Sequence, residues 1–259
     1  MGKDSKIEWT DHTVNLWWGC SKVHTGCKNC YAEYFSDVRY KKNLWGKESK
    51  RQRIKSAFSD LDKYQRKAAE EDKISKIFCG SMMDIFEEDS LLHNPDELNS
   101  SIHDLRVKLF NKINNGEYNN LIFLFLTKRP ENILNSIPAI WINKIPKNVW
   151  FGVSISNQKT ADRYLEIMQQ LNFDNLFLSL EPQIGGIDLF SFLKKVNIKW
   201  IIQGGESGHK RRSFEIKWAY DILTQCRNFG IAYFFKQIDK IQPIPSDLII
   251  REFPIMEKN

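Results

Sequence analysis

Seven short apolar runs, separated by segments with helical periodicity, constrain the fold of this 259-residue chain more than any other feature. Each run is four to six residues long and rich in β-branched or aromatic side chains, as is typical of buried strands. Strands that alternate with helices predict a parallel sheet with right-handed crossovers. We therefore expect an α/β fold, a TIM-like (β/α) barrel that is complete or partial, in a single domain over residues 1–259. The runs are Val14–Trp18, Lys76–Gly80, Leu121–Leu126, Val149–Val153, Leu176–Leu180, Trp200–Gln203 and Ile231–Phe235.

Four segments between these runs carry helical signals. The periodicity predicts helices over Pro95–Asn114, Gln158–Leu171 and Phe214–Asn228, and the last of these ends before Gly230, which suits a helix C-terminus. The mixed-charge segment Ser59–Ser75 predicts an exposed helix or a linker.

Polar side chains follow most of the apolar runs. In a parallel barrel the carboxyl ends of the strands lie on one face, and that face holds the active site. We therefore expect the polar residues at these ends to bind a cofactor or substrate. The candidates are Asp84 after the second run, Ser154, Ser156 and Asn157 after the fourth, Glu181 after the fifth, and Gly204, Gly205 and Glu206 after the sixth.

Three cysteines, Cys20, Cys27 and Cys30, follow the first run closely enough to hold one metal centre. An iron–sulfur cube on three thiolates leaves one iron open to a small molecule. His24 lies between the first two cysteines, so a tetrahedral zinc site is the main alternative, and a set of thiols without metal is the third. The position after a strand, on the expected active-site face, favours a catalytic [4Fe–4S] cluster.

The composition limits the compartment and the partners. Five cysteines, three of them clustered, argue for a reducing cytoplasm, and Cys79 and Cys226 read as buried small residues. No apolar run approaches the ~20 residues that span a bilayer, so we expect no membrane association. The net charge of +6 permits a polyanionic partner. The basic runs Lys47–Lys55 and Lys210–Arg212 are either solvated faces or nucleic-acid contacts.

The chain resembles the phage-associated three-Cys-motif protein family along nearly its whole length. The matching segments are KIEWTDHTVN, GCSKVHTGCKNCYAE, GSMMDIF, LTKRPENI, VWFGVSISNQKTADRY, FLSLEPQIGGIDL, QGGESG and YFFKQ. The resemblance implies a radical-SAM-like barrel, with a distant likeness to spore photoproduct lyase. It implies that Cys20, Cys27 and Cys30 hold a [4Fe–4S] cluster and that S-adenosylmethionine (SAM) binds the open iron and is cleaved to a 5′-deoxyadenosyl radical.

One departure concerns the site of the SAM amino group. Radical SAM enzymes usually carry a GGE motif after the second strand, whereas here Gly204–Glu206 follows the sixth run. We therefore expect Asp84, after the second run, to contact the amino group; its structural alternative is a helix N-cap. The two glycines are expected to present backbone N–H groups to an anion or simply to form a tight turn.

The remaining candidates have similar alternatives. Glu181 and Glu206 are expected to accept hydrogen bonds from an ammonium group or ribose hydroxyls, or else to form buried ion pairs. Ser154, Ser156 and Asn157 are expected near the ribose, or else as helix caps.

The sequence leaves the reaction open. It predicts an external electron donor and, as substrate, a nucleic acid or nucleotide, and it does not identify a catalytic acid or base or show whether a protein partner is required. A metal-binding module that associates with nucleic acid without SAM chemistry is the second hypothesis. A zinc hydrolase using His24 is disfavoured because the histidines are scattered along the chain.

Overall fold

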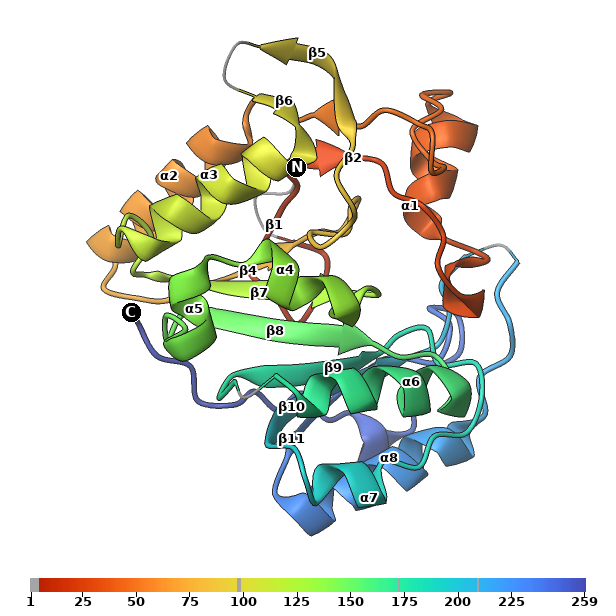
Figure 1. Cartoon of the computed structure of the whole chain (residues 1–259). Coiled ribbons are helices and arrows are strands. Elements are labelled where there is room, and N and C mark those ends of the chain that lie inside the picture. Colours follow the sequence, from red (N-terminus) through yellow and green to blue (C-terminus); the bar gives the residue numbers. More distant parts are fainter. Residues whose placement is uncertain (1–4, 97–98, 172, 209) are drawn as a thin grey trace. The chain divides into compact units, whose positions relative to one another are not determined.

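The structure is a computed structural model that describes residues 5–96, 99–171, 173–208 and 210–259 (Figure 1). Its main sheet has seven strands in the order β1-β4-β7-β8-β9-β10-β11. The pairs β1–β4, β4–β7, β8–β9, β9–β10 and β10–β11 are parallel, which confirms the α/β fold with a parallel sheet. The strands are β1 (His12–Val14), β4 (Ser75–Cys79), β7 (Leu121–Thr127), β8 (Val149–Ser154), β9 (Leu176–Leu180), β10 (Ile198–Gly204) and β11 (Ala232–Gln237).

The prediction of one strand over Val14–Trp18 is wrong. β1 ends at Val14, and β2 (Trp17–Trp18) pairs antiparallel with β3 (Gln52–Arg53) in a separate two-stranded sheet. The chain leaves the main sheet at Asn15, whose side chain accepts a hydrogen bond from Met82 N at 2.7 Å. This bond ties the loop after β1 to the loop after β4. The other six predicted strands are confirmed to within a few residues.

The chain divides into two compact units, and the boundary falls within β8. The first comprises Met1–Lys22, Ala32–Trp150 and Met256–Asn259, and the second comprises Val23–Tyr31 and Phe151–Ile255.

In the first unit, helix α2 (Ala57–Glu70) packs against β1, β4 and β7. Of the helix and the linker expected over Ser59–Ser75, the helix is present, but it ends at Glu70 and buries Leu61 and Tyr64. Helix α3 begins later than predicted, at a capping box formed by Ser101 and Asp104, where both backbone N–H groups find side-chain acceptors. The remaining elements that lie within this unit are α3 (Ile102–Asn114), η2 (Tyr34–Arg39), η3 (Pro130–Asn132), α4 (Ile133–Ser136), α5 (Ala139–Asn143) and the antiparallel pair β5 (Leu91–Asp96) and β6 (Asn99–Ser101).

In the second unit, the predicted helices are confirmed as α6 (Gln158–Gln169) and α8 (Ile216–Phe229). Helix α8 packs on β11 and ends before Gly230, whose φ of 64° lies in the left-handed region that glycine adopts readily. The C-terminal segment then runs antiparallel to β11: Phe235 N donates to Ile250 O, and Glu252 N donates to Tyr233 O, both at 3.1 Å. The short elements are η1 (Thr25–Cys27), α7 (Phe190–Leu193) and η4 (Ser246–Leu248), and α1 (Tyr31–Glu33) starts at the last residue of this unit's first segment.

Among the described residues, no helix combines the length and the apolar character that crossing a bilayer requires.

Candidate functional site

Cys20 follows β2 and lies beside the loops that leave β4 and β7. Gly19 N donates to Met82 O at 3.1 Å, just past the end of β4. Gly19 has a φ of 117°, and a Cβ there would come within 2.7 Å of Leu44 O. Only glycine fits this approach without strain, so the backbone before Cys20 is fixed by the packing around it.

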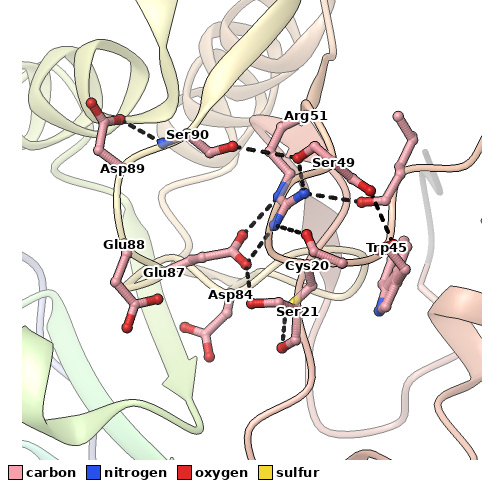
Figure 2. A network of polar contacts seen from close by, with 12 residues as sticks. Cys20, Ser21, Trp45, Ser49, Arg51, Asp84, Glu87, Glu88, Asp89 and Ser90 are labelled. Atoms are coloured by element: carbon pink, nitrogen blue, oxygen red, sulfur yellow. Dashed lines mark hydrogen bonds and ion pairs between the residues drawn. The ribbon is translucent and has the colours of Figure 1, made fainter.

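A buried network of charges surrounds Cys20 (Figure 2). Arg51 holds Glu87 with two parallel bonds, Nε to Oε2 at 3.0 Å and Nη2 to Oε1 at 2.8 Å. Ser21 Oγ donates to the same carboxylate at 3.0 Å. Arg129 Nη2 donates to the carbonyl and hydroxyl oxygens of Ser21, each at 2.8 Å. Both arginines are 1% exposed and Glu87 is 2% exposed. Because the network is buried, leaving any of its charges unpaired would cost folding free energy.

Arg51 corrects the interpretation of the basic run Lys47–Lys55 as one solvated or nucleic-acid-binding face. Besides Glu87, its guanidinium donates to the carbonyl oxygens of Leu44 at 3.1 Å, Gly46 at 3.0 Å and Ser49. It therefore clamps the loop before β3 from the inside, where it cannot reach a polyanion. The sequence feature that could have indicated a carboxylate partner for Arg51 is the acidic stretch that begins at Glu87.

The surroundings of Cys20 disfavour its thiolate in the metal-free protein. Burial raises the pKa of the Cys20 thiol above its usual range, and Glu87 and Asp84 raise it further. Arg129 lowers the pKa, since its Nη1 lies 3.6 Å from the Cys20 sulfur and donates toward it. The thiol is thus protonated at neutral pH, and a metal ion that bound it would displace that proton.

Asp84, the predicted contact of the SAM amino group, is already saturated by protein donors. Its Oδ1 accepts from Phe86 N at 3.0 Å and from Thr127 Oγ1 at 2.7 Å. Its Oδ2 accepts from Lys128 N and from Arg129 Nη1, both at 3.0 Å. Asp84 therefore orients Arg129 in this structure, and an ammonium ligand would have to exchange with one of these donors.

In the second unit, the loop that carries Cys27 and Cys30 is tied to the carboxyl end of β10. Asn29, between the two cysteines, donates to Glu206 Oε2 at 3.0 Å and to Lys210 O at 2.7 Å. Arg212 forms an ion pair with Glu206 and also donates to Thr25 O at 3.0 Å. The cysteine loop and the Gly204–Glu206 turn therefore form one connected structure.

The same loop also packs closely on the end of β8. A Cβ on Gly26 would lie 2.1 Å from Ser156 Oγ and 2.6 Å from His24 Cε1, so only glycine allows the loop to approach Ser156 this closely. His24 Nδ1 accepts from Gly26 N at 2.9 Å. The hydroxyl of Ser156 is buried and has no hydrogen-bond partner among the described residues. Ser156 is therefore a predicted cofactor contact with a buried side-chain oxygen that can still bind a polar group.

The other predicted contacts are engaged within the protein. Asn157 caps α6 by accepting from Thr160 N at 3.0 Å, and Ser154 Oγ donates to Glu181 O at 3.1 Å. Glu181 pairs with Lys236, one of the ion pairs expected as its structural alternative.

The two glycines before Glu206 serve a close backbone approach to β11. Gly205 N donates to Gln237 O at 3.1 Å, and a Cβ on Gly205 would lie 2.1 Å from Ile238 O. The tight-turn alternative therefore accounts for Gly205, whose N–H is used within the protein. Gly204 O likewise accepts from Gln183 N at 2.9 Å.

Glu206 provides a test of this assembly, because Glu206→Gln keeps the shape and removes the charge. Burial raises the pKa of Glu206, but hydrogen bonds from Arg212 and Asn29 outweigh it, and the net shift is downward from 4.5. A lowered folded-state pKa stabilises the protein above the unfolded pKa, and the stabilisation is lost as the pH falls through the folded value. At about pH 7 we expect the variant to be less stable by about 1.5–3 kcal/mol in urea unfolding, the range for hydrogen bonds to a charged group.

The difference between the two proteins should shrink as the pH falls below about 4.5. The exposed Glu215→Gln is the matched control and should change stability little. A difference that persisted unchanged at about pH 3 would mean that Glu206 does not act through its charge.

The chain has side chains that can bind a metal, but the described residues do not form an assembled metal site. All five cysteines are free; Cys20, Cys27 and Cys30 are partly exposed, and Cys79 and Cys226 are buried, as predicted. Within the described part of the chain, no three His, Cys, Asp or Glu side chains are grouped so that they could hold a metal ion. The three-cysteine centre therefore stays a prediction.

The comparisons with known proteins give a family without an assigned activity. Residues 4–247 match the family model described as "Protein of unknown function (DUF5131)". No curated protein and no solved structure matches the chain.

Proposed function

Because the chain belongs to the DUF5131 family, whose function is unknown, we propose its function from its own residues: a radical SAM-type enzyme with a [4Fe–4S] cluster on Cys20, Cys27 and Cys30. The observation that carries the proposal is the bond from Asn29 to Glu206, which ties the loop of two of these cysteines to the carboxyl end of β10. Parallel α/β proteins bind ligands at the carboxyl ends of their strands.

The donor set suits the cluster by its chemistry. Thiolates are the usual protein ligands of iron–sulfur clusters, and these three cysteines form no disulfide. Tetrahedral zinc on Cys20, Cys27, Cys30 and His24 is the competing site. There the ligand nitrogen would be Nε2, because Nδ1 of His24 accepts the hydrogen bond from Gly26 N.

A cluster with one open iron supplies the electron that cleaves SAM and so yields a 5′-deoxyadenosyl radical. The protein's part is to bind, orient and exclude water. Arg129 would donate a hydrogen bond to the sulfur of Cys20 and stabilise its negative charge as a ligand. The buried hydroxyl of Ser156 would bind a polar group of SAM, and we retain the remaining contacts as proposals: Asp84, Ser154, Asn157, Glu181, Gly204, Gly205 and Glu206.

The wider features of the proposal follow from the sequence. We propose a TIM-like barrel in its partial form, since the strand order is linear from β1 to β11. The likeness to the phage-associated three-Cys-motif family, the cytoplasmic location, the external electron donor and a nucleic acid or nucleotide substrate belong to the same proposal.

SAM binding provides the direct test. Adding SAM to the reduced, anaerobically prepared protein should change the electron paramagnetic resonance spectrum, because a ligand joins the open iron. Dithionite should then produce 5′-deoxyadenosine, measured by chromatography. Ser156→Ala should weaken SAM binding about tenfold in calorimetry, as expected for one buried hydrogen bond of about 1.4 kcal/mol.

The exposed Ser191→Ala is the matched control and should bind SAM as the unmodified protein does. An unchanged spectrum together with no heat of SAM binding would refute SAM chemistry and favour a metal-binding module.

A further inference from the structure

Exposed rings and cations alternate on the segment that follows the third cysteine, and the partly exposed Trp18 of β2 lies beside them. Arg39 lies over two rings, with its Cζ 5.5 Å from the centroid of Phe35 and 5.8 Å from that of Tyr40. The centroids of Tyr40 and Trp18 are 6.3 Å apart, and Lys42 Nζ lies 5.7 Å from the centroid of Trp18. We call these five residues, Trp18, Phe35, Arg39, Tyr40 and Lys42, the aromatic–basic surface.

Four of the five residues of the aromatic–basic surface are exposed, and Trp18 is partly exposed. Phe35 is 37% exposed and Tyr40 is 51% exposed. Two neighbours on the same helical segment, Tyr34 and Val38, are 48% and 60% exposed. Large apolar side chains gathered in this way on one element mark an interaction site more often than isolated ones do.

The inner side of the segment is fixed by the first unit. Ser36 is fully buried, and the Asp37 carboxylate accepts from Leu44 N at 2.8 Å and from Trp45 N at 2.9 Å. Tyr40 N donates to Phe35 O at 3.1 Å, the wide turn of η2. The exposed rings therefore stand on a backbone that is already ordered, which lowers the entropy lost when a ligand binds.

The positive charge of this region is not neutralised. Five basic and one acidic side chain lie between residues 39 and 50. Lys42 Nζ donates to the neutral Gln52 Oε1 at 2.8 Å. In the part of the chain that the structure describes, no carboxylate pairs with Arg39, Lys41 or Lys42.

The basic run Lys210–Arg212 differs in this respect. Arg211 pairs with Asp239 at 2.9 Å, and Arg212 pairs with Glu206. Two of its three charges are therefore committed within the protein. The region around Arg39, which the sequence analysis did not single out, has cations that no described carboxylate pairs with, so they can contact a partner.

We propose that the aromatic–basic surface binds single-stranded nucleic acid. Unpaired bases stack on exposed rings, and phosphates contact the interleaved cations; both features are needed for this ligand and are present together. A duplex would offer phosphates but not base faces, and an acidic peptide would not need a row of rings. The inference extends the proposed function by naming a substrate class, and it rests on that function only for the reaction that follows binding.

The test uses the full chain without SAM and a fluorescein-labelled single strand of deoxythymidines, followed by anisotropy. Binding should weaken steeply as salt rises, because phosphate contacts release counterions. Phe35→Ala and Tyr40→Ala should each weaken binding about 5- to 150-fold, which corresponds to about 1–3 kcal/mol per stacked base. Arg39→Gln, which removes little apolar packing, should reduce the slope of log affinity against log salt by about 0.7.

Phe190→Ala is the matched control. This ring is 41% exposed and lies under Lys194 Nζ at 4.6 Å, so it is an aromatic–cation pair outside the aromatic–basic surface, and its loss should leave affinity unchanged. The proposal is overturned if the wild type does not bind at low salt or if the Phe35, Tyr40 and Arg39 variants bind like the wild type. Equal affinity for a duplex of the same length would also overturn it. Because the anisotropy measurements are made without SAM, failure to bind SAM would not change them, and the two proposals can fail separately.

Discussion

Replacing Cys20, Cys27 or Cys30 with alanine is expected to reduce the iron of anaerobically prepared protein from about four atoms per chain to below about one. The cube that we propose has three protein thiolates, and each replacement removes one of them. Iron and acid-labile sulfide assays, with the absorption spectrum, measure the loss.

The two remaining cysteines supply the controls. Cys79 is 1% exposed and Cys226 is fully buried, so neither reaches a surface loop, and Cys79→Ala and Cys226→Ala should retain iron and sulfide. One zinc per chain without sulfide would refute the cluster. Iron that survived Cys20→Ala alone would show that Cys20 is not a ligand and would shift attention to the loop between His24 and Cys30.

Arg51→Met is expected to destabilise the protein by about 3–5 kcal/mol, the usual range when one partner of a buried ion pair is removed. The methionine leaves Glu87, which is 2% exposed, with the longer ion pair to Arg129 Nη2 at 3.4 Å. It also leaves the carbonyl oxygens of Leu44, Gly46 and Ser49 without the guanidinium. Urea unfolding, followed by circular dichroism, gives the free energy of unfolding.

The neighbouring Lys50→Met is the matched control, because Lys50 is exposed, and it should change stability by no more than about 0.5 kcal/mol. The double variant Arg51→Met/Glu87→Gln should recover part of the loss, since it removes the buried carboxylate that has lost its closer cation. A loss below about 1 kcal/mol for Arg51→Met would mean that the network contributes little to stability.

Most of the main sheet could be predicted from the sequence because most residues of its strands are buried. Leu121–Thr127 and Leu176–Leu180, for example, are apolar runs whose burial follows from composition alone. The prediction of one strand over the first run was wrong because the chain leaves the sheet at Asn15. The side chain of Asn15 accepts a hydrogen bond from Met82 N, a contact with a distant loop that the local sequence does not reveal. The small strands β2 and β3 could not be predicted, since two-residue strands exist only through their pairing.

The sequence predicted where the polar residues of the candidate site lie, at the ends of strands, but not which residues they contact. The bond from Asn29 to Glu206 joins residues 177 positions apart, and nothing in either local sequence announces it. Arg51 shows the same limit in the opposite direction: a basic run reads as exposed until a carboxylate 36 residues away is brought beside it. Predictions from local patterns therefore identify which groups gather at strand ends, and the fold decides which of them are already paired.

The C-terminal segment has a consequence for assembly. A strand at the border of a sheet presents free backbone groups that can recruit a strand from another copy and seed aggregation. In this chain Ile250–Glu252 occupies those groups on β11, and Arg251 covers the ring of Phe234, with its Cζ 4.8 Å from the centroid. The C-terminal segment thus covers the edge of the sheet and prevents a strand of another copy from pairing with β11. Removing the chain from residue 250 onward would expose the edge strand β11 and favour aggregation.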